Sequence, residues 1–186
     1  MKIAIVTDST AYLTKEEQAK YNIIEVPIPV IIDGREYKEG VDLTTAEFYD
    51  KLKNSQAFPS TSQPPIGEMI DLYNSLAKQG YDTVISIHLA STISGFYSSL
   101  TQIAPTIEGI KVIPYDSKIT VKLMGYMAIQ ASKMARLGRT PDQILTYLDG
   151  LRQTIDELFV VDDLQNLVRG GRLSNASAFI GGILKI

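Results

Sequence analysis

Runs of β-branched and aliphatic residues alternate along the chain with stretches in which apolar residues recur at helical spacing. The runs at 3–6, 83–87 and 111–115 have the length and composition of strands. The stretches at 65–79 and 119–137 have the apolar stripe of helices that pack on a sheet. This alternation predicts an α/β fold in which a mostly parallel sheet is flanked by helices, as in Rossmann-like domains.

The rhythm of strands and helices begins afresh near Leu158. We therefore predict an N-terminal α/β domain over residues 1–157 and the beginning of a second α/β domain over residues 158–186. The last residues, 183–186, lack the Gly, Pro or charged tail that usually closes a domain. We expect the second domain to be truncated, and its remainder to form the other wall of an interdomain cleft.

Proline, glycine and capping residues predict where individual elements begin and end. Asp33-Gly34 indicates a tight hairpin turn after the strand-like stretch 23–32. Residues 58–65 are rich in Pro, Ser and Thr, and we expect them to form a loop. The remaining expected elements are a helix that begins within 91–95, a helix over 140–157, a strand at 158–161, and short helices after Asp163 and after Ser174.

The composition is that of an ordinary globular protein, with 45% hydrophobic residues and a formal net charge of −3. No basic stripe follows the sequence, so we expect no nucleic-acid partner. The chain contains no cysteine, which excludes disulfides and thiolate chemistry. It shows neither a signal-peptide pattern nor a run of about 20 apolar residues, and we expect a cytoplasmic protein.

Polar residues follow three of the predicted strands at the point where each strand ends. Asp8 and Ser9 follow the first strand, His88 ends the second, and Asp116 ends the third. Ligands of open α/β sheets bind beyond the carboxyl ends of parallel strands, so we expect these residues to gather at one edge of the sheet. Such residues also follow strands when they only cap the next helix, and the sequence leaves that alternative open.

Two hydroxyl-rich segments lie where helices are predicted to begin. Thr61 and Ser62 precede the helix expected to start near Pro65, and Ser94 and Gly95 lie at the start of the next helix. Free N–H groups and the positive end of a helix dipole favour an anion there, such as a carboxylate or a phosphate. A glycine also lets a ligand approach the backbone closely. The simpler alternative is a pair of ordinary helix caps.

Arg172 lies between two predicted helices, within Gly170-Gly171-Arg172-Leu173-Ser174. It can present its fork of donors to an anion across the cleft. Alternatively, it is an exposed arginine between a glycine C-cap and a serine N-cap. The sequence has no glycine-rich phosphate motif, no H-E-x-x-H motif and no calcium-loop pattern, so we expect no nucleotide cofactor and no metal.

The only histidine, His88, keeps an enzymatic function open. A hydrolase or a phosphoryl-transfer enzyme would use Asp8, His88 and Ser94 at the same edge of the sheet. Ser94 is not part of a G-x-S-x-G elbow, and a histidine at a strand end is more often a hydrogen-bonded wall residue than a base. We therefore expect no catalytic residue. A regulatory module that binds some other small anion is a third hypothesis.

Six short motifs occur in an order that resembles the DegV family of fatty-acid-binding proteins. They are Ile5-Val6-Thr7-Asp8-Ser9-Thr10, Val26-Pro27 through Tyr37 and Gly40, Thr61-Ser62-Gln63-Pro64, Ile93-Ser94-Gly95, Asp116-Ser117 and Gly170-Gly171-Arg172-Leu173-Ser174. The resemblance implies a bacterial carrier of two α/β domains with a long-chain fatty acid buried between them and no cofactor. The family presents the carboxylate to a separate kinase subunit, which forms an acyl phosphate. Transient contact with a membrane surface fits such a function.

The resemblance also assigns roles to particular residues. Thr61, Ser62 and Ser94 are implied to bind the carboxylate, and Gly95 to allow its close approach. Arg172 is implied to lie near the head group or to serve the encounter with the kinase.

The sequence departs from the family pattern at three positions. Phe96 and Ser98 stand where Thr and Gln are more frequent, and Glu39 replaces a frequent Asp. We expect Phe96 to narrow the pocket. The resemblance therefore leaves the preferred acyl chain open.

Overall fold

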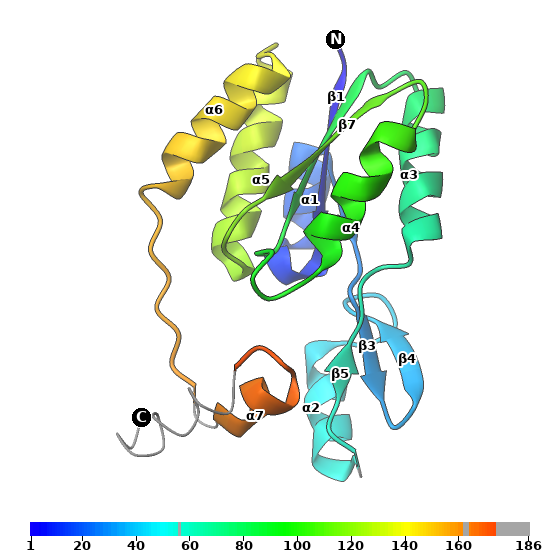
Figure 1. Ribbon diagram of the computed structural model, residues 1–186, viewed down its shortest axis with the longest axis vertical. Helices are drawn as coiled ribbons and strands as arrows, with labels where there is room; N and C mark the ends of the chain where they lie inside the picture. The colour runs from blue at the N-terminus through cyan, green and yellow to red at the C-terminus, as the bar shows by residue number, and fades with distance from the viewer. Residues whose placement is uncertain (56, 162–163, 174–186) are drawn as a thin grey trace.

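The computed structural model describes residues 1–55, 57–161 and 164–173. Its larger part is a parallel sheet between layers of helices, and a smaller antiparallel sheet with one helix lies below it (Figure 1). The larger sheet has the strand order β2-β1-β6-β7, and all its pairings are parallel. Its strands are β1 (Ile3–Asp8), β2 (Ile23–Val26), β6 (Thr83–His88) and β7 (Lys111–Asp116). The predicted α/β architecture is thus confirmed.

Helices cover both faces of this sheet, which explains why its strands are apolar on both sides. Helices α5 and α6 lie on one side, and α3 and α4 lie on the other (Figure 1). In β1, Ile5 packs in the core with α5 and α6, whereas Val6 packs in the core with α3 and α4. The elements around the sheet are α1 (Lys15–Tyr21), α3 (Ile66–Lys78), α4 (Phe96–Ile103), α5 (Val121–Arg136), α6 (Pro141–Arg152) and the 3₁₀ turns η1 (Ser9–Ala11) and η2 (Ala104–Thr106).

The smaller sheet has the order β4-β3-β5, with antiparallel pairings, and α2 (Thr45–Asn54) lies next to it. Its strands are β3 (Pro29–Ile32), β4 (Arg35–Lys38) and β5 (Ser60–Thr61). The predicted hairpin turn joins β3 to β4, with positive φ at both Asp33 and Gly34, as a tight two-residue turn requires. The stretch 23–32 is not one strand, because the chain leaves the first sheet after Val26 and enters the second at Pro29.

Two of the predicted boundaries are wrong because neighbouring segments override the local pattern. Residues 58–65 are not only loop, since β5 forms there by pairing with Val30 and Ile31 of β3. The helix expected to begin within 91–95 begins at Phe96 instead. Before it, the N–H groups of Ile93 and Ser94 both donate to the carbonyl oxygen of Ala90, which closes a turn.

The region after α6 also departs from expectation. Helix α6 ends at Arg152, and residues 158–161 are not a strand. Leu158 is 98% exposed and Val160 is 96% exposed, and none of the described strands pairs with this segment. The expected short helix is confirmed as α7 (Leu164–Arg169), whereas the helix expected after Ser174 lies outside the described residues. Within the described chain, every helix is too short or too polar to cross a membrane.

Candidate ligand site

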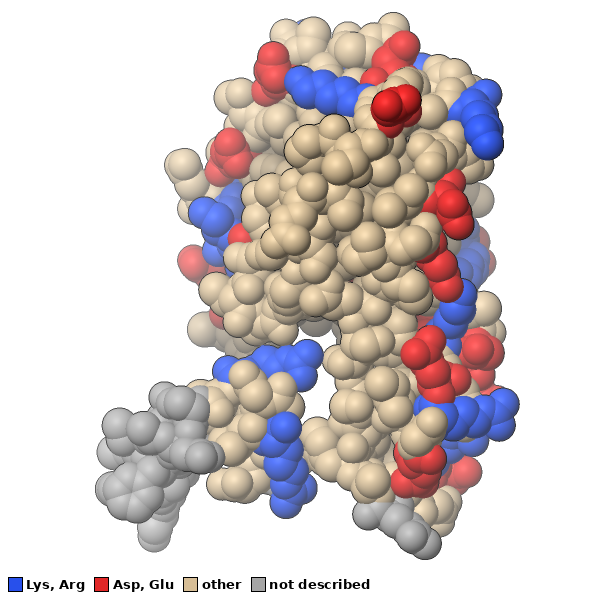
Figure 2. All heavy atoms as spheres, turned by 45° about the vertical axis from the view of Figure 1, so that its right-hand side comes forward, with Lys and Arg blue, Asp and Glu red and all other residues tan. Residues whose placement is uncertain are grey.

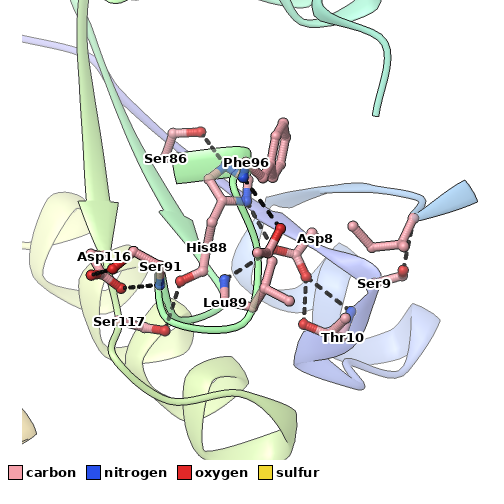
Figure 3. Close-up of polar contacts among 12 residues, drawn as sticks. Asp8, Ser9, Thr10, Ser86, His88, Leu89, Ser91, Phe96, Asp116 and Ser117 are labelled. Atoms are coloured by element: carbon pink, nitrogen blue, oxygen red, sulfur yellow. Dashed lines mark hydrogen bonds and ion pairs between the residues drawn. The ribbon is translucent and has the colours of Figure 1, made fainter. Parts of the chain in front are cut away.

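The carboxyl ends of β1, β6 and β7 lie side by side, as the sequence predicts. The register of β6 and β7 pairs His88 with Asp116, and Asp8 ends the strand on the other side of β6. Figure 3 shows the dashed contacts among Asp8, His88 and Leu89 at this edge. The structure therefore brings Asp8, Ser9, His88 and Asp116 to one edge of the sheet.

A buried chain of hydrogen bonds crosses this edge. His88 Nδ1 lies 2.9 Å from Asp8 Oδ2, and His88 Nε2 lies 2.7 Å from Ser86 Oγ. Ser86 Oγ lies in turn 2.8 Å from the hydroxyl of Tyr73 on α3. Burial raises the pKa of Tyr73 to about 12. All four side chains are buried, and their hydrogen bonds link β1, β6 and α3.

Both side-chain oxygens of Asp8 accept hydrogen bonds from the protein itself. Its Oδ1 accepts hydrogen bonds from the backbone N–H and the hydroxyl of Thr10, at 3.1 and 2.6 Å. Its Oδ2 accepts from His88 and from the backbone N–H of Leu89 at 3.2 Å. Four donors converge on one carboxyl group, which fixes the start of the loops that follow β1 and β6.

This geometry does not support the enzymatic hypothesis. His88 has no exposed surface, and both of its ring nitrogens have partners. Its hydroxyl partner is Ser86, while Ser94 Oγ accepts a hydrogen bond from the N–H of Phe96 at 3.2 Å. A Ser–His–Asp arrangement is present, but all three side chains are fully buried.

Ser9 and Asp116 also fasten loops. The Ser9 hydroxyl donates to Glu39 Oε2 at 2.6 Å and accepts from the N–H of Ile28 at 2.9 Å, which joins β1 to the start of the smaller sheet. Asp116 accepts from the N–H and the hydroxyl of Ser91, at 3.1 and 2.6 Å, and from the N–H of Lys118 (Figure 3). Ser9 and Asp116 thus hold neighbouring loops, whereas Asp8 caps the 3₁₀ turn η1, as the helix-cap alternative predicts.

Phe96 lies in the apolar core, and its effect on the width of a ligand pocket stays a prediction. Its side chain is completely buried in the core that α3 and α4 form with the sheet. The Phe96 ring meets the His88 ring edge-on, with centroids 4.5 Å apart (Figure 3). Phe96 is the first residue of α4, so this ring contact joins the start of α4 to the buried hydrogen-bond chain.

Arg172 connects the two hydroxyl-bearing segments. Its Nη2 donates to the hydroxyl of Thr61 on β5 at 3.3 Å, and its Nε donates to the carbonyl oxygen of Ile93 at 3.3 Å. Ile93 directly precedes Ser94. A third bond, from Nη1 to the carbonyl oxygen of Gly170 at 2.6 Å, holds the guanidinium in place. One positive charge thus lies between Thr61 and the loop that carries Ser94.

The side chains of this second cluster are accessible. Thr61, Ser62 and Arg172 are exposed, and Ser94 is partly buried. Helices α3 and α4 both begin without a side-chain cap. Figure 2 shows the surface hollowed between the upper body and the lower elements, with basic side chains beside the opening. The cluster is therefore open to a ligand, in contrast to the buried chain around His88.

Gln63 and Tyr73 are two participants that the sequence did not reveal. A Cβ added to Gly95 would meet the Gln63 side chain, with Gln63 Nε2 only 2.9 Å away. In the structure, the missing side chain of Gly95 makes room for Gln63. One part of the buried hydrogen-bond chain could be expected from the sequence. Ser86 lies two residues before His88, so the two side chains share one face of the strand.

Together these features define a Rossmann-like α/β protein with an accessible cluster of hydroxyl groups and one guanidinium. The sequence matches the DegV family over residues 2–186, a family described as uncharacterised, and the chain belongs to this family. A DegV domain-containing protein of Listeria monocytogenes is 47% identical over 185 residues, which cover 100% of this chain and 65% of that protein. The chain thus spans about 65% of the length of the curated relatives it matches.

Two solved structures have the same fold. DegV of Bacillus subtilis, described as a fatty acid binding protein, has a TM-score of 0.90 and 43% identity. The match covers 97% of this chain and 64% of that one. A fatty acid binding DegV family protein of Streptococcus agalactiae has a TM-score of 0.89 and 38% identity, over 98% of this chain and 64% of that one.

Proposed function

We propose that this chain binds a long-chain fatty acid and holds its carboxylate with the hydroxyl groups of Thr61, Ser62 and Ser94. The observation that carries the proposal is the position of Arg172, which contacts Thr61 and the residue before Ser94 with one guanidinium. A carboxylate placed there would meet hydroxyl donors from two segments and a positive charge between them. The solved relatives described as fatty acid binding proteins support the identity of the ligand.

The hydrogen bonds already present leave two hydroxyl protons available. Thr61 Oγ1 accepts from Arg172, and Ser94 Oγ accepts from the N–H of Phe96. Because a hydroxyl has one proton as well as two acceptor sites, each can still donate to an anion. Ser62 is a weaker candidate, since its N–H is bonded to the carbonyl oxygen of Pro29 and its hydroxyl has a long contact of 3.4 Å with Gln63.

The role that we propose is that of a carrier, which presents the carboxylate to a separate kinase subunit for acyl-phosphate formation. The resemblance to the DegV family supports the kinase partner and a transient contact with a membrane surface. The burial of His88 supports a carrier over an enzyme, because the single histidine of the chain is unavailable as a base.

Native mass spectrometry of the full-length protein purified from a bacterial host tests the ligand. The expected result is a mass shift that matches one long-chain fatty acid, released under denaturing conditions. A protein that carries no such acid and takes none up from added oleate contradicts the proposal. The kinase step is tested separately, by the formation of acyl phosphate when the lipid-loaded protein, ATP and a fatty-acid kinase subunit are combined.

A further inference from the structure

We infer that Gln63 is a positioning residue of the proposed head-group site, and that it holds the segment of Thr61 and Ser62 against the segment of Ser94. Gln63 does so by reaching over Gly95 to the first turn of α4. The inference rests on the proposed function and assigns a role to a residue outside the proposed carboxylate ligands.

The contacts of Gln63 join two parts of the chain that are distant in sequence. Its Oε1 accepts a hydrogen bond from the hydroxyl of Ser99 at 2.8 Å. The N–H of Ser99 donates to the carbonyl oxygen of Gly95 at 3.0 Å, so Ser99 and Gly95 lie one helical turn apart. Gln63 therefore spans the first turn of α4 from its end to its beginning.

The backbone around Gln63 is restrained on both sides. Ser62 is held by its N–H bond to the carbonyl oxygen of Pro29 at 3.0 Å. Pro64 follows and disfavours a helical backbone at Gln63, and Pro65 leads directly into α3. The side-chain bond to Ser99 then fixes how far the hydroxyls of Thr61 and Ser62 lie from Ser94.

Gly95 is the necessary counterpart of this bridge. A Cβ at position 95 would lie 2.9 Å from Gln63 Nε2, which is too close for a normal contact. An alanine at position 95 must displace the Gln63 amide. Gly95→Ala should therefore disturb the contact between Gln63 and α4.

A double-mutant cycle on the full-length protein tests the bridge between Gln63 and α4. The measured quantity is the affinity of each variant for oleate. Gln63→Ala and Ser99→Ala each remove the bridging hydrogen bond, and we expect each to weaken binding by about 3- to 10-fold. Gly95→Ala should also weaken binding, whereas Gln63→Ala combined with Ser99→Ala should bind no worse than either single variant, because both substitutions remove the same hydrogen bond. Gly67→Ala is the matched control, because its Cβ would meet nothing within 4 Å, and it should bind like the wild type.

The melting temperature of each variant separates positioning from general stability. Gln63, Gly95 and Ser99 lie at or near the surface, so the variants should unfold close to the wild-type temperature while their affinity falls. Unchanged affinity in Gln63→Ala, or losses that multiply in the double variant, would overturn the inference with the proposed function intact. A wild-type protein that binds no fatty acid would instead overturn the proposed function itself.

Discussion

His88 on β6 and Asp8 on β1 form a buried pair, with Nδ1 and Oδ2 2.9 Å apart and neither side chain exposed. The pair lies at the carboxyl edge of the sheet, where ligands of open α/β sheets bind. Its role here is structural, because Asp8 also holds the N–H of Leu89, at the start of the loop that leads to Ser94. The buried pair thus supports the accessible cluster without belonging to it.

The Asp8→Asn variant tests this supporting role. One amide oxygen cannot accept the four hydrogen bonds that the carboxylate accepts, so buried donors lose their partners. We expect the free energy of unfolding, measured by urea denaturation, to fall by about 2–4 kcal/mol. Asp71→Asn, at an exposed position on α3, is the control and should change little. Equal stability of the two variants would contradict the account.

Glu25 on β2 predicts a dependence of stability on pH. Its side chain is only 11% exposed, and burial raises its pKa. Lys15 and a hydrogen bond from Gln18 oppose this increase, and Asp8 and Glu39 add to it. A carboxyl with a raised pKa stabilises the fold below its unfolded pKa, and this contribution is lost as the pH rises through the folded pKa.

The measurement compares the wild type with Glu25→Gln by denaturation at a series of pH values from 3 to 8. Glu25→Gln should be the more stable protein at neutral pH, and the difference should vanish at acid pH. The control is Glu47→Gln. Hydrogen bonds from Thr44 lower the pKa of Glu47, so the effect of this substitution on stability at neutral pH should have the opposite sign. A pH-independent difference for Glu25→Gln would show that burial does not act on its charge.

Two helical glycines give opposite predictions for the same substitution. In Gly125→Ala on α5, the added Cβ would overlap the carbonyl oxygen of Ala11, and the helix would have to move away from η1. We expect a loss of about 2 kcal/mol or more in the free energy of unfolding. In Gly150→Ala on α6, the Cβ meets nothing within 4 Å, and the better helix propensity should add about 0.5–1 kcal/mol. Thermal or urea denaturation of the two variants distinguishes the effect of close packing from that of helix propensity. A Gly125→Ala variant more stable than the wild type would contradict the close contact between α5 and η1.

The sequence is informative wherever a local pattern decides the structure. The main strands follow from apolar runs, because a parallel sheet covered on both faces needs no alternation. Thr14, Thr44 and Thr140 each close a capping box at the start of a helix, so these helix starts are encoded within four residues. Asp33-Gly34 similarly encodes its turn.

Features that depend on distant pairing are not visible in the sequence. The strand β5 is two residues long and exists only because β3 lies beside it. The bond between Tyr73 and Ser86 depends on how α3 packs on the sheet, and the bridge of Gln63 depends on the approach of α4. Segment 158–161 is the opposite case. Its composition is typical of a strand, but none of the described strands lies beside it, and it stays exposed and outside any sheet. The domain boundary at residue 157 and the ligand roles of Thr61, Ser62, Ser94, Gly95 and Arg172 remain predictions.

The most direct test of the account is the oleate affinity of the full-length protein with its hydroxyls removed one at a time. Thr61→Val and Ser94→Ala preserve shape but delete donors to the proposed carboxylate, and Ser98→Ala removes a hydroxyl from an exposed position on α4. Titration calorimetry should show an affinity about tenfold or more weaker for Thr61→Val and for Ser94→Ala, and unchanged for Ser98→Ala. Wild-type affinity in both Thr61→Val and Ser94→Ala would contradict the claim that these hydroxyls hold the carboxylate.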